Sequence, residues 1–447
     1  MTIWSPRLPE NDAPIYGRIA DALERDVRSG MLIPGSQLPT HRELARVLGI
    51  TSVTVTRAYS EAARRGLVES STGRGTFVRA VRRDAAASEE IDLSTNTVSV
   101  PLPLPSPAML QRAGTMLMNA TYAVGRGTER HRAAGAAWLS RGNNISRTDP
   151  ARVIVTAGTQ HALFLALAAT TKPGDTIFTE ALTYHGVKAV AALLHLKLEP
   201  LPLDRYGLVP DALERAARAR SGKVLYTIPS LHNPTTIVMP EKRRREIAAV
   251  AERHGVTIIE DDVSGFLLDK TPPPIAAFAP DRTIFISGLG KAISAAMRVG
   301  YLVAPEALLH GVQSALNATV LFSSPVVAEM ATTWIEDGTA ARVAEQKRAE
   351  IALRQRIARR ILRHDEGDPR AMHLWIELPK RWTADAFVEE ARRRRVRIAS
   401  ASTFAVTPEI PRAVRISIGS PSSIGELETA LHVIAGIGEE RLQEPVV

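Results

Sequence analysis

The chain has 447 residues, 45% of them hydrophobic and 23% charged, so it is long enough to bury a large core and to form two or three domains. The absence of cysteine excludes disulfide bonds and cysteine-ligated metals. No apolar run approaches the roughly 20 residues of a membrane span, and the start of the chain lacks the apolar core of a signal peptide, so we expect a cytoplasmic protein. The net charge of +9 suits a polyanionic partner, but arginine-rich enzymes share it.

The first elements predicted along the chain are helices. Apolar residues recur at every fourth position from Ile15 to Val27, which is the stripe of an amphipathic helix. Thr40 followed by Glu43 forms a capping box, so a second helix is predicted to begin there. Gly49 is expected to end this short helix.

A third helix follows after a tight turn, with Thr51 or Ser52 as its N-cap. Two short helices joined in this way are typical of a helix-turn-helix. The residues expected to form the buried faces of these two helices are Leu44, Val47, Leu48, Val55, Tyr59 and Ala62.

Residues suited to a DNA groove lie on the outward side of this pair. Small hydroxyls reach phosphates, and arginine can read guanine. The candidate DNA-binding residues are Arg42, Ser52, Thr54, Thr56 and Arg57. The following string LVESSTGRGTFV predicts two short strands with Arg74 at their tip, a β-wing placed to meet a DNA backbone or minor groove. The alternative is a small helical subdomain with a solvated arginine face.

The strings LPTHRELARVLGI, TVTRAYSEAARRGLV and GRGTFV closely resemble the winged helix-turn-helix of GntR-type bacterial repressors. The resemblance covers nearly all of residues 14–79 and implies a double-stranded DNA operator as partner. We therefore predict a DNA-binding domain, mainly α with a β-wing, at residues 10–80. An alanine-rich, charged and then proline-rich stretch at 81–104 is interpreted as a linker that ends in an extended arm, rather than as a recognition peptide.

Strands and helices alternate through the next part of the chain. Short apolar strands are expected at 153–157, 177–179, 224–228, 257–259, 283–286 and 301–304. This pattern predicts an α/β domain with a mostly parallel sheet and helices on both faces. After about residue 330 a long helix and two strands predict a smaller α+β lobe. The large domain is thus placed at 105–440, with subdomains of about 105–330 and 331–440. The basic run Arg392–Arg395 is interpreted as a solvated helix face rather than a DNA contact.

Chemically capable residues follow several of these strands. Lys291, just after one strand, could form a Schiff base with an aldehyde, or be a surface lysine. Gly158 and Thr159 begin a helix and could hold a phosphate, or form a plain turn. Asn233 could donate to a phenolate or serve in a turn. Asp261 lies among acids that would need a cation, either a Mg²⁺ ion or a protonated heterocycle.

Together with Arg298, which could meet a phosphate, these residues resemble the cofactor site of fold-type I aminotransferases, which use pyridoxal 5′-phosphate (PLP). The resemblance covers about residues 105–440. Joined to the GntR-type domain, it is similar to the MocR-type regulators, bacterial transcription factors with an aminotransferase-like effector domain.

The resemblance implies a role for each matching residue. Lys291 would form the internal aldimine, and Asp261 would pair with the pyridine nitrogen. Asn233 would bond the ring 3-oxygen, and Tyr184 would stack on the ring. Arg415 would grip an effector carboxylate. The phosphate ligands would be Gly158, Thr159, Ser287 and Arg298.

The sequence departs from the family pattern at three places, one of which is Gly290, where the residue before the lysine is commonly serine. Val263 and Ser264 stand where the family usually has a tyrosine bonded to the ring oxygen. Gly288 stands where a hydroxyl on the phosphate is usual, with Ser287 one step earlier. Weaker PLP binding, or a site less suited to transamination, is therefore expected.

Three functions remain open from the sequence. The first is a DNA-binding regulator that holds PLP on Lys291 and responds to PLP or an amino compound. The second is a working aminotransferase with an added DNA-binding domain, and the third is a DNA-binding dimer whose body no longer binds PLP. The complete winged helix favours the first, and the family resemblance implies a homodimer.

Overall fold

The computed structural model describes residues 4–8, 14–28, 31–32, 36–65, 67–71, 75–78, 90–103, 105–119, 121, 125–142, 145, 148–219, 222–270 and 272–439. They belong to two compact units. The N-terminal unit is drawn from residues 1–88 and 101–106, and the large unit from 89–100 and 107–447.

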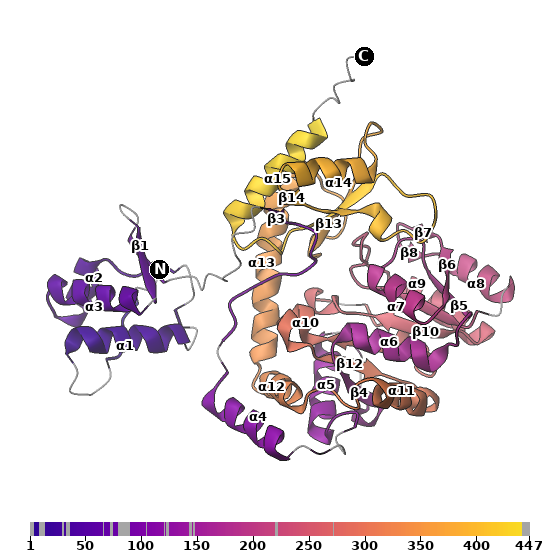
Figure 1. Ribbon diagram of the computed structural model, residues 1–447, viewed down its shortest axis with the longest axis horizontal. Helices are drawn as coiled ribbons and strands as arrows, with labels where there is room; N and C mark the ends of the chain where they lie inside the picture. Colours follow the sequence, from indigo (N-terminus) through magenta and orange to yellow (C-terminus); the bar gives the residue numbers. More distant parts are fainter. Residues whose placement is uncertain are drawn as a thin grey trace. The chain divides into compact units, whose positions relative to one another are not determined.

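The N-terminal unit has the predicted winged helix-turn-helix order (Figure 1). The capping box is confirmed, because Thr40 Oγ1 accepts from the Glu43 amide at 3.3 Å while the Thr40 amide donates to the Glu43 carboxylate at 2.8 Å. Gly49 ends the second helix in the left-handed region at φ 66°. The elements are α1 (Ile15–Arg28), α2 (His41–Leu48), α3 (Ser52–Arg64) and the antiparallel pair β1 (Val68–Ser71) and β2 (Gly75–Val78). The predicted wing tip at Arg74 lies outside the described residues.

The predicted core of this unit is confirmed except at α2. Leu44, Val55, Tyr59 and Ala62 are buried, and Leu48 is half-buried. The prediction for Val47 is wrong, since 40% of this residue is exposed. The buried stripe of α2 includes Ala45, and a residue two positions later points about 200° away around the helix.

The large unit is built on a seven-stranded sheet in the order β4-β12-β11-β10-β9-β5-β6. Its strands are β4 (Val153–Thr156), β5 (Thr176–Glu180), β6 (Lys197–Leu201), β9 (Val224–Thr227), β10 (Thr257–Asp261), β11 (Thr283–Gly288) and β12 (Gly300–Val303). β12 runs antiparallel to both neighbours, and the other pairs are parallel, as the mostly parallel prediction requires. β6 was not predicted, because its sequence KLEPL is polar and contains a proline, which an edge strand tolerates.

Helices cover both faces of this sheet, as predicted (Figure 1). One face packs against α6 (Thr159–Thr170), α7 (His185–Leu193) and α11 (Glu306–Thr319). The other packs against α5 (Glu129–Gly142), α8 (Pro210–Ala219), α9 (Glu241–His254), α12 (Pro325–Glu336) and α13 (Thr339–Leu362). The side chains of β11 alternate between these faces, with Ile284 and Ile286 on the first and Phe285 on the second.

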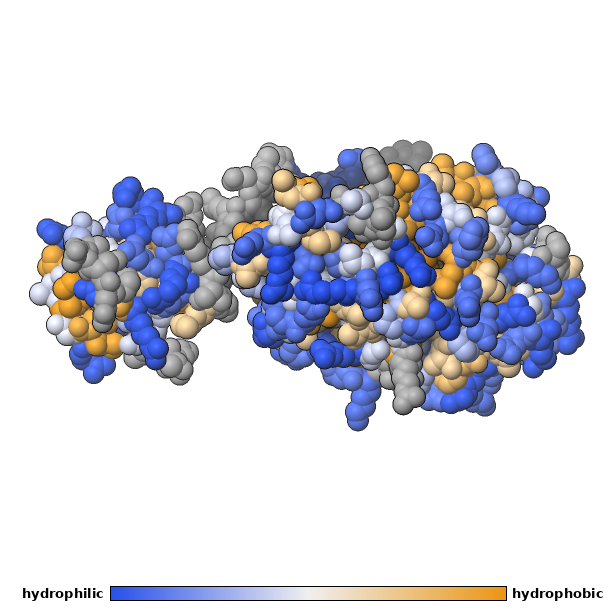
Figure 2. All heavy atoms as spheres, turned by 90° about the horizontal axis from the view of Figure 1, so that it is seen from below, coloured by the Kyte–Doolittle hydropathy of each residue, from blue (hydrophilic) through white to orange (hydrophobic). Residues whose placement is uncertain are grey.

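The smaller lobe holds a three-stranded sheet in the order β13-β16-β15. These strands are β13 (His373–Glu377), β15 (Ala399–Ser400) and β16 (Ala413–Ser417), with helices α14 (Ala384–Arg393) and α15 (Ile424–Glu439). In the basic run, Arg392 and Arg393 are exposed and pair with Glu389, as a solvated helix face requires. The visible surface mixes hydrophilic and hydrophobic residues rather than separating them (Figure 2).

Part of the segment predicted as a linker is a structural element of the lobe. β3 (Ile91–Asp92) pairs in parallel with β14 (Val396–Arg397), and Leu93 is fully buried in the core of the lobe. Residues 90–100 of the predicted linker 81–104 therefore belong to the large unit. The apolar residues Ile91 and Leu93 explain the difference, because they give this short stretch a face to bury.

Candidate cofactor site and DNA-binding face

The polar residues predicted for the cofactor site lie at one edge of the large sheet. β9, β10 and β11 are parallel neighbours, so their carboxyl ends meet at this edge. Asp261 is the last residue of β10, and Asn233 lies in the loop after β9. Lys291 lies in α10 (Leu289–Ala292), which follows β11 without a break. The fold thus brings together three residues that the sequence separates.

The environments of Asp261 and Lys291 push their pKa values toward each other. Burial raises the pKa of the Asp261 carboxyl from 3.8 to about 6, against the opposing effects of a Tyr226 bond and the Lys291 charge. Burial and the Arg415 charge lower the pKa of the Lys291 amine to about 8, against the opposing Asp261 charge. An amine with a lowered pKa is more often neutral near pH 7 to 8, which is the form that attacks an aldehyde.

Tyr226, which the sequence analysis did not single out, holds Asp261 in place. Its hydroxyl donates to Asp261 Oδ2 at 2.7 Å, and its ring is fully buried in β9. The other oxygen, Oδ1, is buried and has no hydrogen-bond partner among the described residues. A buried acceptor is costly when unpaired, so this oxygen suits a cationic N–H donor such as a protonated pyridine.

The residues predicted to hold a phosphate converge at the start of α6. Gly158 precedes this helix with φ 90°, and a Cβ built on it would lie 3.0 Å from Nη2 of Arg298. A Cβ built on Gly288 would lie 2.9 Å from Cγ2 of Thr159. A glycine before a helix N-terminus and beside a guanidinium makes an anion site. The hydroxyl of Ser287, the fourth predicted phosphate ligand, donates to the Asp262 carbonyl at 2.9 Å, so its proton is already used in a bond to the backbone.

Arg415 lies between the large subdomain and the lobe. It is 3% exposed, and its Nη1 donates to Asn233 Oδ1 at 2.8 Å. Its guanidinium carbon lies 4.7 Å from the ring centre of Phe404. Burial raises the pKa of Tyr184, and the charges of Asp261, Arg298 and Arg415 also act on it, so Tyr184 belongs to the same site.

The acids beside Asp261 do not converge on a metal ion. Glu260 accepts from the amides of Ile275 and Ala276 and lies 3.8 Å from Arg244. Successive strand residues point to opposite faces, so Glu260 and Asp261 cannot face one ligand. Within the described ranges, no group of three or more histidines or acids is arranged to hold a metal. Of the two alternatives left by the sequence, the geometry favours a protonated heterocycle.

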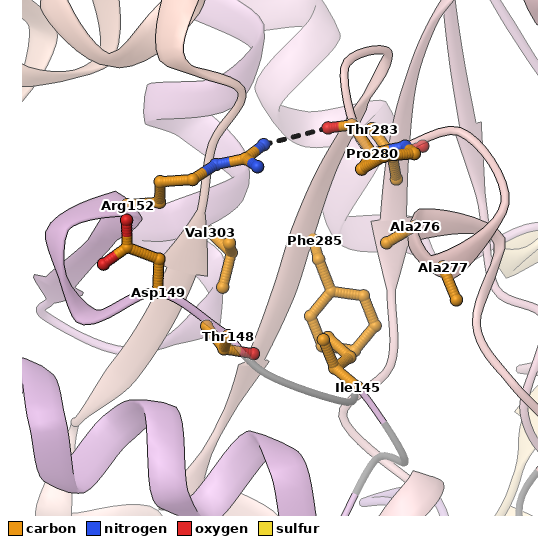
Figure 3. A pocket seen from close by; sticks show the side chains of 10 residues that line it. All are labelled: Ile145, Thr148, Asp149, Arg152, Ala276, Ala277, Pro280, Thr283, Phe285 and Val303. Carbon is orange, nitrogen blue, oxygen red and sulfur yellow. Dashed lines mark hydrogen bonds between the residues drawn. The ribbon is translucent and has the colours of Figure 1, made fainter.

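A separate cavity of about 270 Å³ lies away from these residues (Figure 3). Asp149, Arg152, Pro280, Thr283 and Phe285 are among its lining residues, and Arg152 Nη2 donates to the Pro280 carbonyl at 2.9 Å. Thr283 begins β11, whereas Lys291 follows its end. The cavity therefore lies at the sheet edge opposite the candidate cofactor site.

The side chains of the predicted DNA-binding residues differ in their exposure and in their hydrogen bonds within the protein. Ser52, Arg42 and Arg57 are exposed, and neither arginine forms an ion pair with a residue that the structure describes. The Thr54 hydroxyl is bonded to that of Thr51 at 2.9 Å, and the Thr56 hydroxyl donates to the Ser52 carbonyl at 2.9 Å. The two arginines are therefore the side chains most available to DNA.

Val53 was missed by the sequence analysis. It is 63% exposed and precedes Arg57 by four residues, so the two share a face of α3. An exposed apolar side chain on this face can contact a thymine methyl group. Its spacing from Arg57 was the signal that could have found it.

The fold and this site define a protein that joins a GntR-type DNA-binding domain to an aminotransferase-like body. Residues 88–434 match the family "Aminotransferase class I and II", and residues 15–78 match "Bacterial regulatory proteins, gntR family". The chain belongs to both families, in the combination of the MocR-type transcriptional regulators.

Several proteins named as transcriptional regulators are similar to most of this chain. The HTH-type transcriptional regulator YdeF of Bacillus subtilis is 30% identical over 445 residues, with 96% of each chain covered. The HTH-type pyridoxine biosynthesis transcriptional regulator PdxR of Corynebacterium glutamicum is 29% identical, covering 66% of this chain and 67% of its own. TauR of Rhodobacter capsulatus is 28% identical, covering 71% and 73%.

Solved aminotransferases share the fold of the large unit. Kynurenine aminotransferase of Pyrococcus horikoshii, in complex with PMP, has a TM-score of 0.70 at 21% identity, covering 80% of this chain and 93% of its own. LysN of Thermus thermophilus, complexed with N-(5′-phosphopyridoxyl)-L-leucine, has a TM-score of 0.68 at 21% identity, covering 85% and 97%. No helix among the described residues is long and apolar enough to span a membrane.

Replacing Asp261 with asparagine should stabilise the ligand-free protein near neutral pH. Because the folded pKa of about 6 exceeds the ordinary 3.8, the wild-type protein loses stability as the pH rises through this window. At about 1.4 kcal/mol per pKa unit, the difference should reach at most about 3 kcal/mol above pH 7 and vanish near pH 4. Urea unfolding from pH 4 to 8 measures it.

The control for this experiment is Asp281→Asn, which makes the same substitution at an exposed position. Equal stability of Asp261→Asn and the wild type at pH 7.5 would show that the surroundings of Asp261 do not disfavour its ionised form.

Replacing Arg57 with alanine should weaken binding to the cognate DNA by about 1 to 3 kcal/mol if this arginine reads a base. The DNA can be selected from a random pool with the wild-type protein and the affinities compared by gel shift. Arg64→Ala is the matched control, because Arg64 is exposed on the same helix but pairs with Glu61. An unchanged affinity for Arg57→Ala removes this residue from the interface.

Proposed function

We propose that this protein is a transcriptional regulator that binds double-stranded operator DNA through its N-terminal unit and binds PLP through Lys291. PLP, or an amino compound that reacts with it, is the signal. The observation that carries this proposal is the free Oδ1 of the buried Asp261, one strand away from an amine whose pKa is lowered. A regulator of chromosomal DNA acts in the bacterial cytoplasm, where we place this protein.

The donor set fits PLP group by group. Asp261 Oδ1 is free for a protonated ring nitrogen, while Tyr226 holds Oδ2. The start of α6 with Arg298 suits the phosphate. Since Asn233 Oδ1 already accepts from Arg415, its amide nitrogen is the group left to donate to the ring oxygen.

PLP, when bound, supplies an aldehyde that condenses with primary amines. The residues of the protein then orient the reacting groups and hold protons at stated atoms. The lowered pKa of the Lys291 amine keeps a share of it neutral near pH 8, and the Tyr226 hydroxyl holds Oδ2 of Asp261, which leaves Oδ1 for a ring nitrogen. Arg415 presents its unpaired Nε–H to the carboxylate of an amino acid effector.

A regulatory role is favoured over steady catalysis. The relatives that match most of this chain are named as transcriptional regulators. Val263 and Ser264 stand where the family tyrosine is usual, and this change weakens the ring contacts that transamination uses. An aminotransferase would instead turn over amino donors at roughly 1 per second or more.

We further propose a homodimer in which a second copy covers α4 (Pro107–Asn119). Met109 and Ala113 bury one side of this helix, whereas Leu110, Leu117 and Met118 are 54%, 71% and 82% exposed. Exposed apolar groups on one helix mark an association surface. Two-fold symmetry also matches the paired half-sites that such DNA-binding domains read.

Replacing Lys291 with alanine should abolish the visible absorption band that appears when the wild-type protein is mixed with PLP. The reason is that Lys291 supplies the amine that captures the aldehyde. Spectrophotometric titration measures this, with Lys347→Met as the control, because the buried Lys347 is a neighbouring lysine whose Nζ donates to the Lys291 carbonyl. A band that persists in Lys291→Ala and is lost in Lys347→Met would contradict the proposal, because Lys347 rather than Lys291 would then capture the aldehyde.

The double variant Leu117→Asp, Met118→Asp should be monomeric at concentrations where the wild type is dimeric. Charges at these positions cannot be buried without a partner. Light scattering gives the mass of each protein, and Ile410→Asp, at an exposed apolar residue of the lobe, is the control. A dimeric double variant would place the interface elsewhere.

A further inference from the structure

The segment Glu90–Val100 is bonded into the lobe from two sides. The amides of Ile91 and Leu93 donate to the carbonyls of Arg395 and Arg397 at 2.8 and 2.7 Å. On the other side, the Ser417 amide donates to the Leu93 carbonyl at 2.8 Å. The segment therefore fills the place of a strand between β14 and the end of β16.

Asp92 folds the next residues into a compact turn. Its Oδ1 accepts from the amide and the hydroxyl of Ser94 at 2.7 and 2.6 Å. Its Oδ2 accepts from the Thr95 hydroxyl at 2.7 Å and from Arg397 at 3.0 Å. Because one carboxylate accepts all of these bonds, the backbone of the turn is held in place, and this fixes the direction of the Ser94 carbonyl.

The Ser94 carbonyl accepts a hydrogen bond from Nη2 of Arg415. The same guanidinium donates through Nη1 to Asn233, and its Nε is buried without a hydrogen-bond partner in the described part of the chain. One side chain thus joins the lobe, the loop after β9 and the turn at Asp92.

A carboxylate on Arg415 would compete with Ser94. The bidentate arrangement that arginine offers to a carboxylate uses two adjacent nitrogens, and the unpaired Nε lies next to Nη2. A carboxylate that takes Nε and Nη2 would bring a charged oxygen beside the Ser94 carbonyl, which is bonded to the same nitrogen. The charged carboxylate oxygen repels the partially negative Ser94 carbonyl oxygen at Nη2, and because the carboxylate forms the stronger bond, the Ser94 carbonyl is displaced.

We propose that the Asp92–Thr95 turn senses the effector carboxylate: a carboxylate bound to Arg415 releases Ser94 and loosens the segment Glu90–Val100. In the sequence this segment lies between the two stretches of the N-terminal unit, residues 1–88 and 101–106, so its release acts on the connection to the DNA-binding domain. The inference rests on the proposed function, since it takes the effector to be held at the PLP site.

Hydrogen exchange of the full-length, PLP-free protein tests this with two stable probes. One is N-(5′-phosphopyridoxyl)-L-alanine, and the other is N-(5′-phosphopyridoxyl)ethylamine, which lacks the carboxylate. Both should slow exchange at residues 289–293 around Lys291. The alanine probe alone should speed exchange at Ser94 and Thr95, whose amides are bonded to Asp92, and Arg415→Gln should remove this difference.

The outcomes separate the two proposals. If the alanine probe slows exchange at 289–293 but leaves 90–100 unchanged, the sensing turn is overturned and the cofactor site stands. If neither probe affects 289–293, the PLP site itself is wrong and the sensing turn falls with it.

A matched pair of variants at Asp92 gives a second measurement. Asp92→Ala removes the acceptors of the turn and weakens the competition from Ser94, so the preference for the alanine probe over the ethylamine probe should rise by about threefold to tenfold. Asp92→Asn keeps one acceptor oxygen and should change this ratio less. A purely structural role would alter the affinity for both probes equally, and an unchanged ratio in Asp92→Ala contradicts the proposal.

Discussion

The candidate cofactor site depends on a carboxylate and an amine held at the ends of two adjacent parallel strands. Neither charge is stable in an apolar interior without a partner. Asp261 has Tyr226 on one oxygen and the charge of Lys291 nearby, and this holds both groups at the sheet edge. The register of β9, β10 and β11 makes the arrangement possible, because it brings residues far apart in the chain to one edge.

The same edge also meets the smaller lobe. Arg415 comes from β16, yet it bonds Asn233 in the loop after β9. A ligand at this junction contacts both parts of the large unit at once. The site is therefore suited to distinguish between ligands as well as to hold a cofactor. In this way an aminotransferase-like domain can serve as the effector domain of a regulator.

Much of this arrangement could be predicted from local sequence. The short apolar strands and the capping box at Thr40 have strong local signals, and the structure contains both. Val47 was misplaced because an eight-residue helix gives too few turns to define its buried stripe. β6 was missed because an edge strand need not be apolar.

The contacts at the site were less accessible from the sequence. Tyr226 lies in an apolar strand, where nothing local separates a packing tyrosine from one that bonds a carboxylate. Ser94 and Arg415 are 321 residues apart. Every residue has a backbone carbonyl, so the residue type at position 94 does not show that its carbonyl accepts this bond. The candidate phosphate residues could be proposed from the sequence because a glycine at a strand-to-helix turn is a local signal for a helix N-terminus that can hold an anion.

The bond between Arg415 and Ser94 has a consequence in the reverse direction. Coupling between two binding sites is reciprocal, so the factor by which one ligand changes the affinity for a second is also the factor by which the second changes the affinity for the first. If a carboxylate on Arg415 alters DNA affinity, then DNA alters the affinity of Arg415 for carboxylates. Molecules on their operator and molecules free in solution would then respond at different effector concentrations.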